Sequence, residues 1–177
     1  MKSMFLAMVI AVLAAGSARA ADAALLEQAL AAAQATFARA MPQLEPLPLG
    51  VDTIAYGAAL RGRAFQSAQW DGPVALVTEI RRAATGSCSR FAAFVVTPPE
   101  NGAIRLVLCP QFFTPGRDDL RELTLLHELV HVVAGPDECR AMGFAALVEQ
   151  AARGSFTPVD VYWQANDCPA SAFALPD

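Results

Sequence analysis

The amino-acid sequence predicts one α+β domain, because helical and strand patterns occupy separate parts of the chain. Residues 23–41 are rich in alanine, with larger apolar residues at near-helical spacing. Two short apolar runs, 91–96 and 104–108, flank a turn that contains proline and glycine, which is typical of an antiparallel hairpin. Residues 120–133 are apolar nearly all round, which predicts a helix buried in the middle of the domain.

The chain begins with a segment, residues 1–20, that is typical of a secretory signal peptide. Lys2 supplies the positive charge, 5–15 is an apolar run, and 18–20 is an Ala-Arg-Ala cleavage site. The apolar run is too short to span a bilayer, so no stable membrane anchor is expected. We therefore expect one exported domain at 21–177, periplasmic or extracellular.

The size of this domain and its net charge limit the functions it can have. Without the predicted signal peptide, 157 of the 177 residues remain, which is enough for one hydrophobic core. The basic count falls from 13 to 11 against 17 acidic residues, so the net charge is −6. This balance argues against a nucleic-acid partner, which usually requires a basic face. Nothing in the sequence sets the oligomeric state, and a monomer is the default expectation.

The elements before the hairpin follow from local patterns. The helix at 23–41 should stop at Pro42, and further prolines make the following stretch extended. A second N-terminal helix is expected within 51–65, although two glycines weaken it. Periodicity does not decide whether the apolar stretch 74–84 is a strand or a helix. With the hairpin, these elements predict N-terminal helices followed by a small antiparallel sheet.

Four cysteines in an exported chain predict two disulfides. Cys88 and Cys109 lie at the outer ends of the hairpin, where a disulfide could bridge its two strands. Cys168 would then tie the tail, 156–177, to Cys139. The tail contains prolines and is expected to be mostly irregular.

Two helices are expected after the hairpin. Thr114 or Asp118 can cap the buried helix, and Gly135 should end it. A further helix is expected over 137–153, closed by Gly154. The buried helix is thus followed after a short turn by a second helix, and the first residues of the second helix can lie close to the buried one.

The buried helix holds the only histidines of the chain, His127 and His131, with Glu128 directly after the first. This H-E-x-x-H pattern is typical of zinc peptidases. On a helix both imidazoles project from one face and can share a metal ion. Glu128 can then take a proton from a metal-activated water. A zinc site that only braces the fold usually has four protein ligands and does not need Glu128, so catalytic Zn²⁺ is the expected cofactor.

With no histidine left, the third metal ligand must be a carboxylate or a cysteine. Asp137, Glu138 and Cys139 follow the helix closely enough to return to the metal. Cys139 is disfavoured because a disulfide is expected for it in an exported chain. Asp137 also fits a plain role as an acid at a helix start.

Three local features resemble the aspzincins, the family of fungal deuterolysin and the peptidyl-Lys metalloendopeptidases. They are the Cys-Pro-Gln-Phe-Phe segment at 109–113, the H-E-x-x-H pattern, and Gly135, four residues after His131. The resemblance covers residues 88–142. It implies a zincin-like metallopeptidase fold and a secreted zinc endopeptidase that cuts proteins or peptides.

The resemblance also bears on the site residues. The family loop reads G-T-x-D, and an ungapped comparison places Glu138 on the ligand position, one residue after Asp137. It therefore implies Glu138 as the third zinc ligand, with Asp137 as the alternative. The oxyanion-stabilising tyrosine of the family falls on Ala141, so that role needs another donor. The donors that the sequence offers are Tyr162, which we take as the catalytic candidate, Tyr56 and Arg140.

Two other functions remain open. The missing tyrosine would suit a catalytically weak binding or interaction protein on the same scaffold, although the intact Glu128 argues against this. A metal-dependent amidase acting on non-protein material, such as cell wall, would use the same residues. The sequence does not place an acidic specificity pocket, so no preference for lysine is implied.

Overall fold

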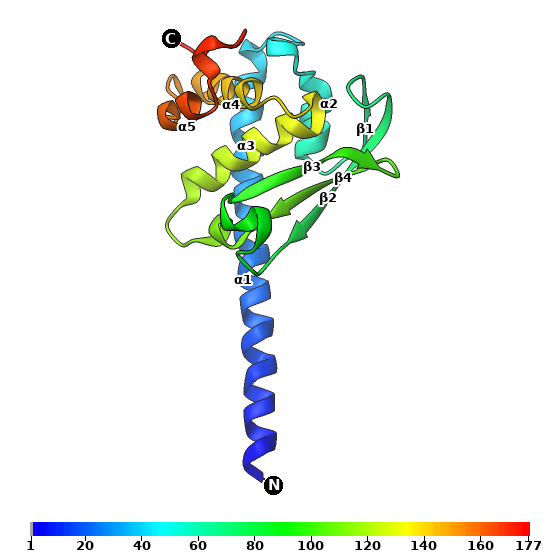
Figure 1. Ribbon diagram of the computed structural model, residues 1–177, viewed down its shortest axis with the longest axis vertical. Helices are drawn as coiled ribbons and strands as arrows, with labels where there is room; N and C mark the ends of the chain where they lie inside the picture. Colours follow the sequence, from blue (N-terminus) through cyan, green and yellow to red (C-terminus); the bar gives the residue numbers. More distant parts are fainter. Residues whose placement is uncertain (1) are drawn as a thin grey trace.

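The computed structural model describes the backbone of residues 2–177 and the side chains from Arg19 onwards. It shows a mixed α+β structure, which confirms the α+β class predicted from the sequence (Figure 1). The helices are α1 (Lys2–Ala40), α2 (Thr53–Leu60), α3 (Asp118–Ala134), α4 (Glu138–Arg153) and α5 (Asp160–Ala165). The strands are β1 (Phe65–Ser67), β2 (Gly72–Ile80), β3 (Ala93–Glu100) and β4 (Ala103–Leu108).

The four strands form one sheet in the order β1-β2-β4-β3. The predicted hairpin is confirmed, because β3 and β4 pair antiparallel, and Asn101 and Gly102 form its turn. The expectation of a purely antiparallel sheet is wrong, since β2 pairs with β4 in parallel. The stretch 74–84, which periodicity left undecided, is a strand as far as Ile80, and the hairpin then returns β4 between β2 and β3.

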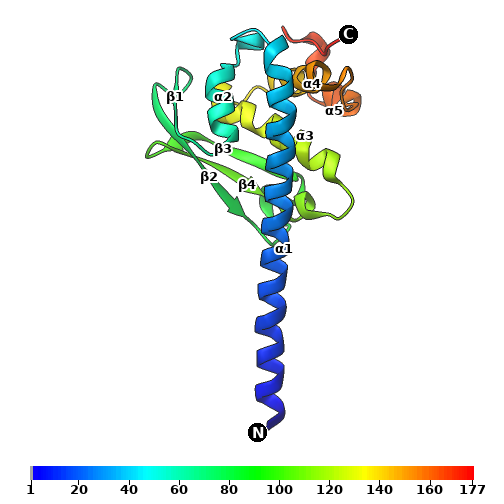
Figure 2. The ribbon, with the colours of Figure 1, turned by 180° about the vertical axis from the view of Figure 1, so that it is seen from behind.

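Helix α1 is the longest element, and its C-terminal part packs against α3 and α4 (Figures 1 and 2). Its N-terminal part extends away from the domain in both views. The helix predicted at 23–41 is confirmed within α1, which ends at Ala40, two residues before Pro42. The signal-peptide prediction for 1–20 falls almost wholly outside the described side chains. Within the described part of the chain, no helix is both long and apolar enough to cross a membrane.

One hydrophobic core joins α1, α2, α3, α4 and one face of the sheet. Helix α3 runs through it, and most of its residues from Leu125 to Ala134 are buried, as the apolar pattern predicts. Tyr56 of α2 is fully buried and donates a 2.7 Å hydrogen bond to the carbonyl of Leu126. Trp70, just before β2, donates its indole N–H to the carbonyl of Val132 at 2.8 Å. These contacts fix α3 against the rest of the domain.

The ends of α3 and α4 are partly as predicted. Gly135, with φ of 90°, ends α3, and Gly154, with φ of 73°, ends α4 in the left-handed region that favours glycine. The capping prediction for α3 is wrong: its N-cap is Arg117, without a capping side chain. Asp118 instead pairs with Arg121, which is buried and also donates to the backbone before the helix.

Both predicted disulfides are present, Cys88–Cys109 and Cys139–Cys168. Two disulfides fit a protein that folds in an oxidising, exported environment. Cys88 lies in a short 3-10 turn just before β3 rather than on the strand itself. The expectation of a mostly irregular tail is wrong in part, because the tail contains α5. That short helix could not be predicted, because prolines flank the segment on both sides and favour irregular structure.

The tail is attached to α4 by buried polar groups as well as by a disulfide. Glu149 is 1% exposed and accepts hydrogen bonds from the backbone N–H and the hydroxyl of Thr157. Arg153 pairs with Glu122 of α3 and donates to Thr36 of α1. The Glu149 contacts hold the start of the tail against α4, and the Arg153 contacts hold the end of α4 against α3 and α1.

Candidate metal centre

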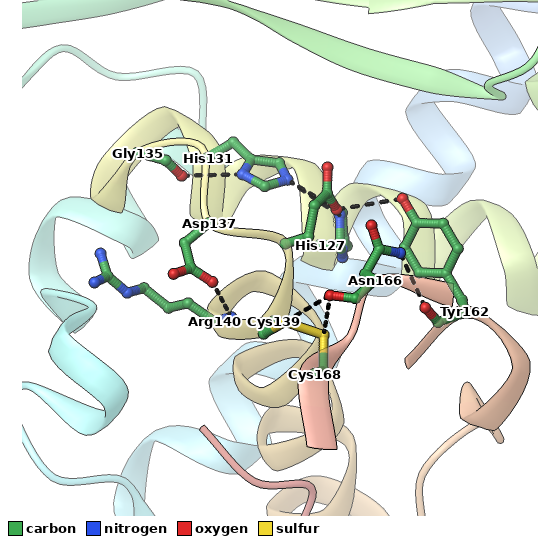
Figure 3. Close-up of polar contacts among 10 residues, drawn as sticks. His127, His131, Gly135, Asp137, Cys139, Arg140, Tyr162, Asn166 and Cys168 are labelled. Carbon is green, nitrogen blue, oxygen red and sulfur yellow. Dashed lines mark hydrogen bonds and ion pairs between the residues drawn. A yellow bond between two sulfur atoms is a disulfide. The ribbon is translucent and has the colours of Figure 1, made fainter. Parts of the chain in front are cut away.

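Helix α3 brings the two histidines together. His127 and His131 lie on successive turns of one face, and their Nε2 atoms are 3.1 Å apart (Figure 3). Both imidazoles are largely buried, with side-chain exposures of 12% and 8%. Two ring nitrogens that converge in this way need a proton or a cation between them, because their lone pairs repel.

Glu138 completes the group from the first turn of α4. Its Oε2 lies 3.1 Å from Nε2 of His127 and 3.6 Å from Nε2 of His131. The reversal at Gly135 brings this carboxylate back over α3. A β-carbon at Gly135 would also lie 3.2 Å from the Gln69 side chain. This close approach of Gln69 is a second reason, besides the positive φ, why glycine suits position 135.

The spacing of the three atoms is compatible with one bound zinc ion. Zinc bound tetrahedrally at 2.0–2.1 Å holds its ligand atoms about 3.3–3.4 Å from one another. The separations of 3.1, 3.1 and 3.6 Å match this triangle. Within the part of the chain that the structure describes, these residues are also the group of three potential ligands whose atoms lie together. Two imidazoles and one carboxylate suit Zn²⁺, with a fourth position left for water or substrate.

A second contact orients His131 for this role. Its Nδ1 lies 3.0 Å from the carbonyl oxygen of Gly135, to which it donates a hydrogen bond (Figure 3). With Nδ1 protonated in this way, the Nε2 lone pair would be available to a metal ion that displaced the proton Nε2 shares with its neighbours. Zinc-binding histidines commonly have such a partner, which fixes both tautomer and ring orientation. The same glycine therefore ends the helix and positions a candidate ligand.

Burial and neighbouring charges shift the pKa values of the two glutamates in the site. Burial raises the pKa of the Glu138 carboxyl, but hydrogen bonds from His127 and His131 outweigh it and hold this pKa far below its usual range. A carboxylate that stays ionised is the form that binds a cation. For Glu128, burial raises the pKa above its usual value and the two histidines only partly oppose this.

Glu128 lies beside the ligands but does not join them. It is 8% exposed and lines two cavities that flank the histidines, of about 750 Å³ and 120 Å³. Glu128 is therefore buried beside the two histidines of α3 without belonging to the group of three potential ligands.

Tyr162 comes to the site from the tail. Its hydroxyl donates a 3.2 Å hydrogen bond to Oε2 of Glu138, and its ring centre lies 6.1 Å from that of His127. Burial, and then the negative charge of Glu138, raise the pKa of this phenol. The two other donors suggested by the sequence lie elsewhere. Tyr56 is buried against the carbonyl of Leu126, and Arg140 donates to the carbonyl of Ala134.

The two neighbours of Glu138, Asp137 and Cys139, contribute to the fold rather than to the group of potential ligands. The carboxylate of Asp137 caps α4 by accepting a 2.9 Å hydrogen bond from the backbone N–H of Arg140, and it points away from the histidines (Figure 3). Cys139 is bonded to Cys168. Of the three possible third ligands, the structure brings only Glu138 to the two histidines.

The disulfide next to Glu138 yields a stability prediction. Replacing Cys139 and Cys168 together by serine should lower the free energy of unfolding by about 2–4 kcal/mol, because the unfolded chain loses a cross-link. The tail should then become sensitive to an added protease, while the Cys88→Ser/Cys109→Ser variant keeps it protected. Denaturant unfolding and limited proteolysis would measure both effects. Equal protection of the tail in the two variants would contradict the prediction.

Strand β3 borders the smaller cavity and has a free edge, because it is the last strand of the sheet. The N–H of Cys109 donates to the carbonyl of Ala92, which sets the alternation of the ladder. By this alternation Phe94 bonds to β4, and the backbone groups of Ala93 and Val95 face the free edge. An extended chain could add to the sheet here, directly beside the histidines.

Sequence reasoning missed several residues around this centre. Phe91 and Val161 border the larger cavity, and the carbonyl of Gly135 orients His131. The pattern of the chain offered a signal only for Gly135, as a helix end. Comparisons with models of known protein families, with curated proteins and with solved structures found no match for this chain.

Proposed function

We propose that this protein is an exported zinc-dependent endopeptidase, acting in the periplasm or outside the cell. The observation that carries the proposal is the triangle of His127, His131 and Glu138, with the buried Glu128 beside it in a groove. The resemblance of the H-E-x-x-H pattern and its flanking segments to the aspzincins supports the same reading. A purely structural metal site would not need an open groove or a free carboxylate.

Each residue has a separate role in the proposed reaction. Zinc held by this group would supply Lewis-acid activation of a water and of the substrate carbonyl. Glu128 takes the proton from the attacking water and later delivers it to the leaving amine. Tyr162 is the nearest hydroxyl donor to the group and would donate to the carbonyl oxygen as its negative charge develops. Gly135 holds His131 in the required orientation through its carbonyl.

The substrate is a polypeptide in an extended conformation. Its backbone pairs with the free edge of β3 at Ala93 and Val95, which places a peptide bond beside Glu128. Pairing cannot extend far beyond Thr97, because Pro98 and Pro99 lack an N–H to donate. Main-chain pairing of this kind binds unfolded segments rather than folded surfaces.

The proposal is tested by incubating the purified exported domain with an unfolded protein. We expect about one zinc ion per chain, cleavage of the unfolded protein, loss of cleavage after chelation, and recovery when zinc is added. Zinc content and product masses would be measured on the same samples. Bound zinc without cleavage of any polypeptide would overturn the peptidase and favour the amidase or the binding protein. A chain that takes up no zinc would overturn the metal centre itself.

A further inference from the structure

The larger cavity beside the metal centre has an apolar wall. It reaches from His127 and Glu128 along the N-terminal half of α3 and under the start of α5. Its volume of about 750 Å³ exceeds what a single water or ion would occupy. The side chains that give it an apolar character are those of Phe91, Phe112, Leu120, Leu123, Met142 and Val161.

Exposed apolar residues are concentrated at the mouth of this cavity. Among the described side chains, seven large apolar ones are exposed, and four of them line it. Val161 is the most exposed of these, at 86%, although its helix α5 lies between Thr157, which is bonded to Glu149, and Cys168, which is bonded to Cys139. A cluster of this kind on an exported protein indicates a surface that is covered by a ligand. The four residues are Phe91, Leu120, Val161 and Tyr162.

The charges around the cavity disfavour a basic side chain. Its carboxylates are Glu128, at the metal centre, and Asp160. Three arginines line it as well, Arg90, Arg117 and Arg121. Arg121 is paired with Asp118, so two carboxylates face two remaining arginines. A lysine entering the cavity would therefore meet no excess of negative charge, and burying its charge without a partner is costly.

We propose that this cavity is the specificity pocket of the peptidase, and that it takes a large apolar side chain, that of Leu, Met or Phe. The side chain belongs to one of the two residues that flank the bond to be cut, because the cavity begins at His127 and Glu128. This inference rests on the proposed function. It assigns Val161 and Leu120 to substrate selection, and it excludes a preference for lysine.

The first test maps cut sites on a mixture of unfolded proteins. We expect Leu, Met and Phe to be enriched at one flanking position of the sites. A peptide with Leu at that position should be cut at least about tenfold faster than the same peptide with Lys, as expected for discrimination by an apolar pocket. Metal-dependent cleavage without apolar enrichment, or with Lys favoured, would overturn the pocket and leave the peptidase standing. No cleavage by a zinc-loaded protein would overturn the peptidase.

The second test uses a matched pair of surface variants. Val161→Glu places a charge at the mouth of the cavity and should raise KM for the Leu peptide about tenfold, with zinc content unchanged. Because Val161 is so exposed, the variant should fold normally. Ile54→Glu is the control, since Ile54 is 72% exposed on α2 and does not line the cavity. The same KM for both variants would contradict the assignment of Val161.

Discussion

Glu128→Gln should lower the rate of cleavage of an unfolded protein by about 10²–10⁴-fold, while the protein keeps its zinc. The amide has the shape of the carboxyl group but cannot accept the proton of the attacking water. Glu128 does not belong to the triangle of ligand atoms, so its loss leaves His127, His131 and Glu138 in place. Turnover and bound zinc would be measured on the same preparations of variant and wild type.

The control for this variant is Asp119→Asn. It also removes one negative charge from α3, but from an exposed position in the first turn, two turns before the histidines. Its turnover should equal that of the wild type. Loss of zinc from Glu128→Gln would show that Glu128 is a ligand. Unchanged turnover in Glu128→Gln would remove the proton acceptor from the mechanism.

The sequence could predict the core of this site because helical geometry determines it. His127 and His131 fall on one face of α3 wherever that helix lies, and the apolar residues around them make it buried. The glycine after the helix limits the next residues to a short return. Local rules therefore bring Asp137, Glu138 and Cys139 close to the histidines, and only the comparison with the aspzincin loop favoured Glu138 among them.

The remaining parts depend on contacts between distant segments. Tyr162 reaches Glu138 because the Cys139–Cys168 disulfide and the buried Glu149 hold the tail beside α4. No pattern within the tail shows this. The apolar mouth of the large cavity likewise forms from α3, α5 and the segment before β3. Its residues look like ordinary core residues in the sequence, and only their exposure in the folded chain distinguishes them.

The sheet was mispredicted for a similar reason. The two short apolar runs identify β3 and β4 and the turn between them. They do not show that β2 pairs with β4 rather than with β3, nor that the pair is parallel. That arrangement is what leaves β3 at the edge beside the histidines. The free edge on which the proposed substrate pairing depends is thus a property of the topology alone.

Glu138→Ala should weaken zinc binding by more than about 100-fold, since loss of even an outer partner of a ligand costs 10–100-fold. The fold should survive, because the Glu138 side chain is 39% exposed and makes its contacts with the other metal-site residues. Zinc should therefore raise the thermal stability of the wild type but not that of the variant. Metal titration and thermal unfolding with and without zinc would measure this.

Asp137→Ala is the matched variant, one residue away and with the opposite expected result. Asp137 caps α4, so its loss should lower the free energy of unfolding by about 0.5–2 kcal/mol. Zinc affinity should stay the same, because its carboxylate points away from the histidines. The two variants separate ligand from cap by different measurements. If Asp137→Ala lost zinc and Glu138→Ala kept it, the loop would bind the metal through the earlier carboxylate, and α4 would have to begin differently when zinc is bound.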